Sequence, residues 1–187
     1  MAKRLAACAI CHGKHGQGDL ERNGDVYPRL AGQPAGYLFA QIVRFQSARR
    51  VGIPPVVVMR RLLDNLPPDY LHRIADFYAS AAPPFPPRPQ ITAAELSQGR
   101  EVVTRGLSQA HVVPCTSCHG ANLTGRPPDV PALAGQYAGY LWIQFAHWQQ
   151  GARHNRRHEH IAAALTEAQL AAVVDYLASL RPAESQP

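Results

Sequence analysis

Apolar residues recur at helical spacing in two segments that match each other across the chain. The segments span residues 36–50 and 139–153. On one face the first carries Leu38, Ile42 and Phe45, and the second carries Leu141, Phe145 and Trp148. Spacings of three and four residues are typical of an amphipathic helix that covers a core. Each half of the chain is therefore predicted to contain one long helix at this position.

Capping signals place further helices. Thr92 and Glu95 have the spacing of a capping box and predict a helix running to about Gly106. A final helix is predicted over residues 68–80, opened by a proline. Its counterpart begins at Thr166, where Gln169 completes a second box, and ends near Leu180. No segment alternates convincingly, and the valine run 56–58 is too short for a strand. The fold class is predicted to be all-α.

A repeat organises these elements into two domains. The segment 28–33, Pro-Arg-Leu-Ala-Gly-Gln, returns at 131–136 as Pro-Ala-Leu-Ala-Gly-Gln. Two homologous halves explain this better than chance does. We place the first domain at residues 1–82 and the second at residues 92–187. The proline-rich stretch 83–91 favours an extended, semi-rigid connector between them.

Composition narrows the possible functions. The 187 residues carry a formal charge of +6, supplied almost entirely by arginine. Basic and aromatic residues are not interleaved, which argues against nucleic acid as a partner. The longest uncharged apolar runs are shorter than the ~20 residues that a membrane-spanning helix needs.

The chemistry lies in a pentapeptide that occurs twice, Cys-Ala-Ile-Cys-His at 8–12 and Cys-Thr-Ser-Cys-His at 115–119. C-x-x-C-H is the attachment site of c-type haem, in which each thiol adds to a porphyrin vinyl group. A four-cysteine zinc site spaces its pairs by about 15–20 residues, far fewer than separate these pairs. A thioredoxin-like pair would lie near a βαβ pattern, and disulfides would not require the histidines. The motif predicts two covalent haems, anchored by Cys8, Cys11, Cys115 and Cys118 and bound proximally by His12 and His119.

The motifs C-x-x-C-H-G and P-x-L-A-G-Q-x-x-x-Y-L-x-x-Q, followed by the closing helices, cover nearly the whole chain in two copies. On these features the chain resembles the dihaem class I c-type cytochromes of the cytochrome c4 type. The resemblance implies two tandem class I cytochrome c domains, each wrapped around one haem. It also implies a methionine as sixth iron ligand, from a loop before the last helix of each domain. Met59 occupies that position in the first half.

The second half departs from the family pattern because it contains no methionine. Leu66 aligns with Leu165, and the same spacing aligns Met59 with His158. His158 is therefore the expected ligand, His160 is the second choice, and His154 or an open iron remains as a further alternative. Imidazole favours ferric iron more than thioether does, so a His/His haem is expected to have the lower reduction potential.

Several supporting roles are also expected. Pro28 and Pro131 are placed to brace the proximal imidazoles through their carbonyls. Tyr37 and Gln41 recur in the second half as Tyr140 and Gln144. We expect these residues either to line the haems or to pack the helices. The arginines at 49, 50, 60 and 61 form either a docking surface for an acidic partner or a solvated face.

The resemblance implies an electron carrier, or a cytochrome subunit of a redox complex, rather than an enzyme. Its expected partners are a quinol-oxidising complex, a terminal oxidase or a dehydrogenase, with possible docking to a membrane complex. We expect it in the periplasm, where c-type haem is attached. Residues 1–5 do not read as a signal peptide, so a leader is expected to have been removed or the start misassigned. The alternative function is a haem enzyme or small-ligand sensor with an open site on the second haem.

Overall fold

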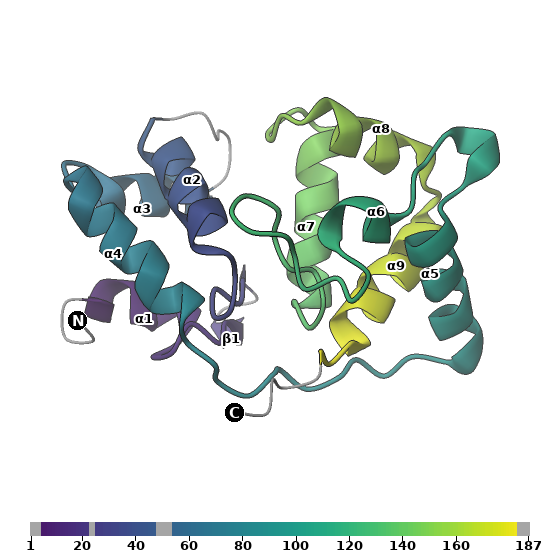
Figure 1. Ribbon diagram of the computed structural model, residues 1–187, viewed down its shortest axis with the longest axis horizontal. Coiled ribbons are helices and arrows are strands. Elements are labelled where there is room, and N and C mark those ends of the chain that lie inside the picture. The colour runs from purple at the N-terminus through teal and green to yellow at the C-terminus, as the bar shows by residue number, and fades with distance from the viewer. Residues whose placement is uncertain (1–4, 23–24, 48–53, 183–187) are drawn as a thin grey trace. The chain divides into compact units, whose positions relative to one another are not determined.

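The computed structural model describes residues 5–22, 25–47 and 54–182. The chain divides into two compact units (Figure 1). Unit 1 consists of Met1–Pro84 together with Pro127–Pro131. Unit 2 consists of Phe85–Arg126 and Ala132–Pro187.

Unit 1 is built mainly from helices. Its elements are α1 (Ala6–His12), β1 (Asp19–Arg22), β2 (Asp25–Tyr27), α2 (Ala35–Gln46), α3 (Pro54–Leu63) and α4 (Pro68–Ala79). Helix α2 packs against both α3 and α4. The core between them is formed by buried side chains that include Leu38, Ile42, Leu71 and Ile74.

The strands β1 and β2 were not predicted. They pair antiparallel, with Asp19 opposite Tyr27 and Arg22 opposite Asp25. At four and three residues they are too short for an alternating pattern to appear in the sequence. The hairpin is a local feature, and the fold remains helical.

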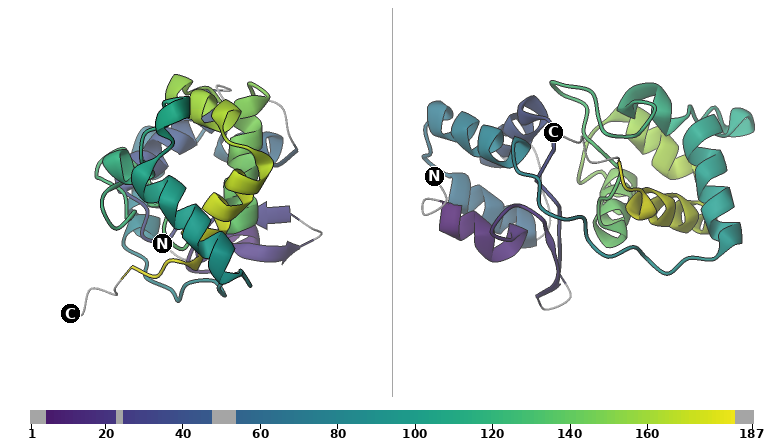
Figure 2. Two further views of the ribbon diagram at one scale, coloured as in Figure 1. Left: turned by 90° about the vertical axis from the view of Figure 1, so that its right-hand side faces the viewer. Right: turned by 60° about the horizontal axis from the view of Figure 1, so that its bottom comes forward.

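Unit 2 repeats this plan with an additional first helix. Its elements are α5 (Ala93–Arg105), a 3-10 turn (Ser108–Ala110), α6 (Cys115–His119), α7 (Ala138–Gln149), α8 (Arg156–Ala164) and α9 (Glu167–Ser179). Figure 2 shows α5 crossing α9, and this is the most extensive helix contact in the unit. Both predicted capping boxes are present, Thr92 with Glu95 and Thr166 with Gln169. The predicted bounds of α5 and α9 are confirmed because these boxes fix where the helices begin.

The sequence repeat corresponds to a repeated backbone turn. In unit 1 the amide of Gly32 donates to the carbonyl of Tyr78, 3.0 Å away, and in unit 2 the amide of Gly135 donates to the carbonyl of Leu177, 2.9 Å away. Both glycines have positive φ, +75° and +70°, which a residue with a side chain rarely adopts. The Leu-Ala-Gly-Gln segments thus tie each unit's central turn to the end of its last helix.

Two predictions about elements need correction. Helix α7 ends at Gln149, before the predicted limit of 153. The segments around Met59 and His158, expected as loops, are the helices α3 and α8. The side chain of Asn155 accepts a hydrogen bond from the backbone amide of His158 and so caps α8. Asparagine is a favoured N-cap residue, so this start of a helix could have been predicted from the sequence.

The proline-rich connector contains neither helix nor strand over residues 81–92, as its composition predicts. In unit 1, the buried guanidinium of Arg29 donates to the carbonyls of Pro83 and Pro84 at 2.7 and 2.8 Å. In unit 2, Arg181 donates to the carbonyl of Pro86 and lies over the ring of Phe85. Each unit therefore holds its own end of the connector.

Within the described ranges, no single helix is long and apolar enough to cross a membrane. Helices α8 and α9 pass that test only as a pair, bent by 118°.

Candidate functional site

The cysteine motifs form two short helices with the same geometry. Cys8, Cys11 and His12 lie at positions i, i+3 and i+4 of α1, so the three side chains share one helix face. Helix α6 presents Cys115, Cys118 and His119 in the same way. All four thiols are free and partly buried. Each helix therefore offers two unbridged thiols and one imidazole to the same side, as covalent haem attachment requires.

The thiols are not arranged for a metal ion. Burial raises the pKa of Cys8, and it raises the pKa of Cys115 to about 11, so these groups are neutral at physiological pH. Nowhere in the described residues do three or more His, Cys, Asp or Glu side chains gather as a metal site. This arrangement gives no support to the four-cysteine zinc alternative, which needs the two pairs together.

His12 is oriented by the backbone. Its side chain is buried, and Nδ1 lies 3.1 Å from the carbonyl oxygen of Pro28. This confirms the brace expected from Pro28. Burial lowers the pKa of His12, so the imidazole is neutral. Donation from Nδ1 leaves the lone pair on Nε2, the nitrogen that would face an iron.

Met59 lies on α3 and is partly buried against the core of unit 1. Its helical neighbours Val58 and Arg60 are exposed, so this methionine is on the inward face. The amide of Gln46 donates to the carbonyl of Leu63 at 3.0 Å and so ties α2 to the end of α3. Met59 is thus held toward the interior by a helix that is itself anchored.

In unit 2, His158 on α8 faces His119. Their ring centroids are 6.0 Å apart, with an angle of 80° between the ring planes. Nδ1 of His158 is buried and has no hydrogen-bond partner within the described part of the chain. A buried imidazole nitrogen without a partner is costly unless a missing group satisfies it.

The other two candidate histidines are directed elsewhere. His154 has 74% of its side chain exposed and lies 3.5 Å from the carboxylate of Glu159. His160 is exposed, and its Nε2 is 3.1 Å from the carbonyl of Ala110. Of the three, only His158 is half-buried, has a buried nitrogen without a partner among the described residues and faces His119.

The spacing of these two imidazoles is compatible with a haem iron between them. Metal–imidazole bonds of about 2 Å place two opposed nitrogens about 4 Å apart and their ring centres about 6 Å apart. The separation of 6.0 Å between His119 and His158 matches this value. The donor set of one buried and one half-buried imidazole beside two free thiols therefore suits a covalently attached, six-coordinate haem.

One side chain of α7, that of Trp148, lies against His158. Trp148 stacks on its ring at 4.4 Å with an angle of 24° between planes, and the Trp148 indole nitrogen is buried without a partner among the described residues. Burial first, and then the charges of His119, Arg153 and Arg157, lower the pKa of His158 to about 4. The imidazole is therefore neutral at physiological pH, as a metal ligand must be.

Sequence reasoning did not anticipate the roles of Trp148, Arg153 and Gln149. Trp148 was placed on an apolar face, but its stacking partner lies on another helix. The Gln149 amide donates to the carbonyl of Ala162 at 2.8 Å and anchors α8 as Gln46 anchors α3. The repeat aligns Gln46 with Gln149, and from this alignment the same anchoring role could have been predicted for both residues.

The other expected contacts have mixed outcomes. Gln41 and Gln144 are both buried. Arg60 and Arg61 are exposed on α3, whereas positions 49 and 50 lie outside the described residues. The brace from Pro131 to His119 stays a prediction.

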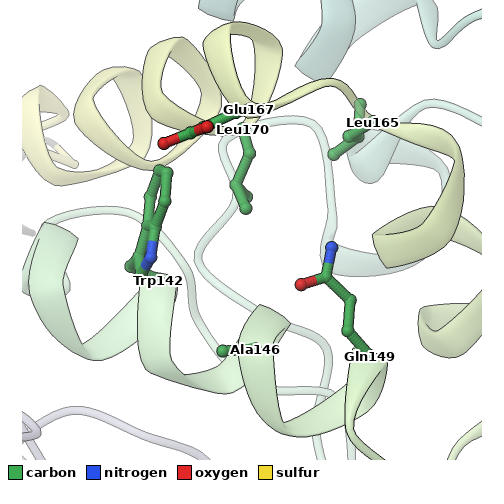
Figure 3. Close-up of a pocket in the computed structure, with 6 residues that line it drawn as sticks. All are labelled: Trp142, Ala146, Gln149, Leu165, Glu167 and Leu170. Atoms are coloured by element: carbon green, nitrogen blue, oxygen red, sulfur yellow. The ribbon is translucent and has the colours of Figure 1, made fainter.

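A separate cavity of about 290 Å³ lies in unit 2 (Figure 3). Its lining residues are Trp142, Ala146, Gln149, Leu165, Glu167 and Leu170. None of the predicted haem ligands lines it, so it is not the candidate site.

Comparison with known proteins agrees with this geometry. The family model for cytochrome c matches residues 103–181. The chain is 32% identical to the thiosulfate dehydrogenase electron acceptor of Thiomonas intermedia, covering 96% of this chain and 82% of that protein. It is 31% identical to cytochrome c4 of Azotobacter vinelandii, covering 95% of this chain and 86% of that protein. The crystal structure of reduced cytochrome c4 from Pseudomonas stutzeri superposes with a TM-score of 0.81 at 27% identity, covering 96% of each chain.

Proposed function

Because this chain belongs to the cytochrome c4 family of dihaem c-type cytochromes, we propose that it carries single electrons between periplasmic or membrane-bound redox partners. In this proposal the first haem has His/Met ligation and the second has His/His ligation. The observation that carries the proposal is the pair of facing imidazoles, buried His119 and half-buried His158, with ring centroids 6.0 Å apart.

The roles of the chain's residues follow from the two motifs. Cys8 and Cys11 would anchor the first haem and Cys115 and Cys118 the second, through thioether bonds. His12 and Met59 would bind the first iron, and His119 and His158 the second. When bound, the haem supplies an iron that changes between ferric and ferrous states without binding substrate. The chain supplies neutral ligands of fixed orientation and a largely apolar surrounding.

The difference in ligands sets an order of potentials. Imidazole stabilises ferric iron relative to thioether, so the second haem would have the lower potential in a comparable pocket. Electrons would then enter at the second haem and leave from the first.

The partners are proposed from the relatives. The relative from Thiomonas intermedia is named as an electron acceptor of thiosulfate dehydrogenase. A dehydrogenase is therefore a candidate donor for this chain, beside a quinol-oxidising complex, and a terminal oxidase is a candidate acceptor. Exposed Arg60 and Arg61 on α3 favour an acidic surface on one of these proteins.

Low-temperature EPR of the oxidised holoprotein, combined with a redox titration that resolves the two haems, tests the proposal. Two low-spin signals are expected, one His/Met and one His/His, with the His/His haem at lower potential. A five-coordinate, high-spin second haem would instead support the enzyme or sensor alternative. Equal potentials, or a higher potential for the second haem, would refute the proposed direction of transfer.

A further inference from the structure

A cation is stacked against the ring system that covers His158. The guanidinium carbon of Arg153 lies 4.8 Å from the centre of the Trp148 ring. Trp148 also stacks on His158, with ring centroids 4.4 Å apart. Trp148 thus contacts both Arg153 and His158, and the His158 ring in turn lies 6.0 Å from that of His119.

The position of Arg153 is fixed by further contacts. Its Nη1 donates to the buried Oε1 of Gln144 at 2.8 Å, and its backbone amide donates to the carbonyl of His147 at 3.1 Å. Gln144 and His147 both lie on α7, the helix that carries Trp148. Phe145, also on α7, packs edge-on against Trp148 at 5.4 Å. The charge is therefore held in place rather than carried on a freely rotating side chain.

The equivalent positions of the first unit differ at the aromatic residue. The repeat aligns Gln144 with Gln41, whose Oε1 is buried with no partner among the residues that the structure describes. It aligns Trp148 with Phe45, which has no indole. An indole at this position is thus specific to the unit in which histidine replaces methionine, whereas Arg50, which aligns with Arg153, lies outside the described residues.

We propose that Arg153 is a positioning residue that raises the reduction potential of the second haem through its fixed positive charge. This inference rests on the proposed ligation by His158. Ferric haem carries one more positive charge than ferrous haem, so a cation held nearby disfavours the oxidised form.

The direction of this effect opposes that of the imidazole ligand. A His/His haem alone would have a much lower potential than a His/Met haem. The charge of Arg153 offsets part of this decrease in reduction potential. The same electron donors can therefore still reduce the second haem. Trp148 contributes by excluding water from the ligand, which leaves the charge less screened.

The test is a titration of the intact dihaem protein, with Arg153→Met as the neutral variant of similar length and Arg153→Lys as the variant that keeps the charge. Arg156→Gln removes a charge from an exposed residue of the same helix as His158 and is the matched control. We expect a lower second-haem potential in R153M, recovery of most of the shift in R153K, and no shift in R156Q. The first-haem potential should be unchanged in all three and serves as the internal reference.

EPR of the same samples separates this inference from the proposed function. If the unmodified protein shows no His/His signal, the ligation proposal fails. If that signal is present and R153M leaves the potential unchanged, the role of Arg153 is wrong. Equal potentials in R153M and R153K would show a packing effect instead of a charge effect. Should R153M not assemble, Gln144→Leu removes the oxygen that accepts from Arg153 at 2.8 Å and keeps the arginine itself. It should lower the second-haem potential by a smaller amount, and an unchanged potential there would also overturn the inference.

Discussion

The backbone of Gly99 in α5 lies against the carbonyl oxygen of Ala172 in α9. A methyl group at residue 99 would overlap that oxygen and the Cβ atom of Tyr176. The close approach lets the first and last helices of unit 2 cross with little space between them.

Gly99→Ala is therefore expected to destabilise unit 2. Alanine favours a helix over glycine by about 0.8–1.0 kcal/mol, but overpacking a close contact typically costs about 1–3 kcal/mol. We expect a net loss and a lower Tm, measured by circular dichroism of the holoprotein. Ser97→Ala, at an exposed site on α5, is the control and should be neutral or slightly stabilising. A Tm in G99A at or above the unmodified value would show that the helices can separate without cost.

Replacing His158 should change the second haem alone. His158→Met would restore the ligand type of the family and should raise the second-haem potential, because thioether stabilises ferrous iron. His158→Ala should convert that haem to a high-spin form able to bind added imidazole. His154→Ala and His160→Ala are matched controls and should leave the EPR spectrum unchanged. A spectral change in H160A but not in H158A would reassign the ligand.

The reciprocal change tests the first haem. Met59→His should lower its potential toward that of the second haem, and the oxidised protein should show two similar His/His signals in EPR. Met59→Leu should leave the first iron without a sixth protein ligand while filling the same space in the core. An unchanged first-haem spectrum in M59L would exclude Met59 as the ligand.

Arg29 should stabilise unit 1 through the connector. Arg29 makes two hydrogen bonds from a charged donor. We therefore expect Arg29→Ala to lower the free energy of unfolding by about 2–3 kcal/mol. Arg29→Lys should recover only part of this, because an ammonium lacks the planar fork that reaches both carbonyls. Arg44→Ala removes the same charge from an exposed site on α2 and should have little effect on urea unfolding. Equal stability of R29A and R44A would mean that the connector contacts contribute nothing.

Local signals allowed much of the fold to be predicted from the sequence. The boxes at Thr92 and Thr166 placed α5 and α9 correctly because a cap acts within one helical turn. The hairpin β1–β2 was missed because its pairing spans too few residues to leave a pattern. Helix α8 was expected to be a loop because the family resemblance places the sixth ligand in a loop, and the capping signal of Asn155 was not used.

The candidate site, like the fold, could be predicted only in part from the sequence. The alignment of the halves selected His158, and the structure places it half-buried, with its ring centroid 6.0 Å from that of His119; its role as a ligand stays a prediction. The stack of Arg153 and Trp148 was not predictable, because the contact of Trp148 with His158 joins two helices whose packing angle no short motif encodes.

The three histidines within residues 154–160 have a consequence for the unfolded chain. A haem bound through thioethers cannot dissociate, so during refolding its iron would meet all three imidazoles. The loops from His119 to His154, His158 and His160 are so similar in length that their closure free energies differ by only about 0.1 kcal/mol. Chain entropy alone would not discriminate among them, and kinetic traps with the wrong axial imidazole would form readily. The native choice would be made late, when α8 docks on α7 and Trp148 closes over a single ring.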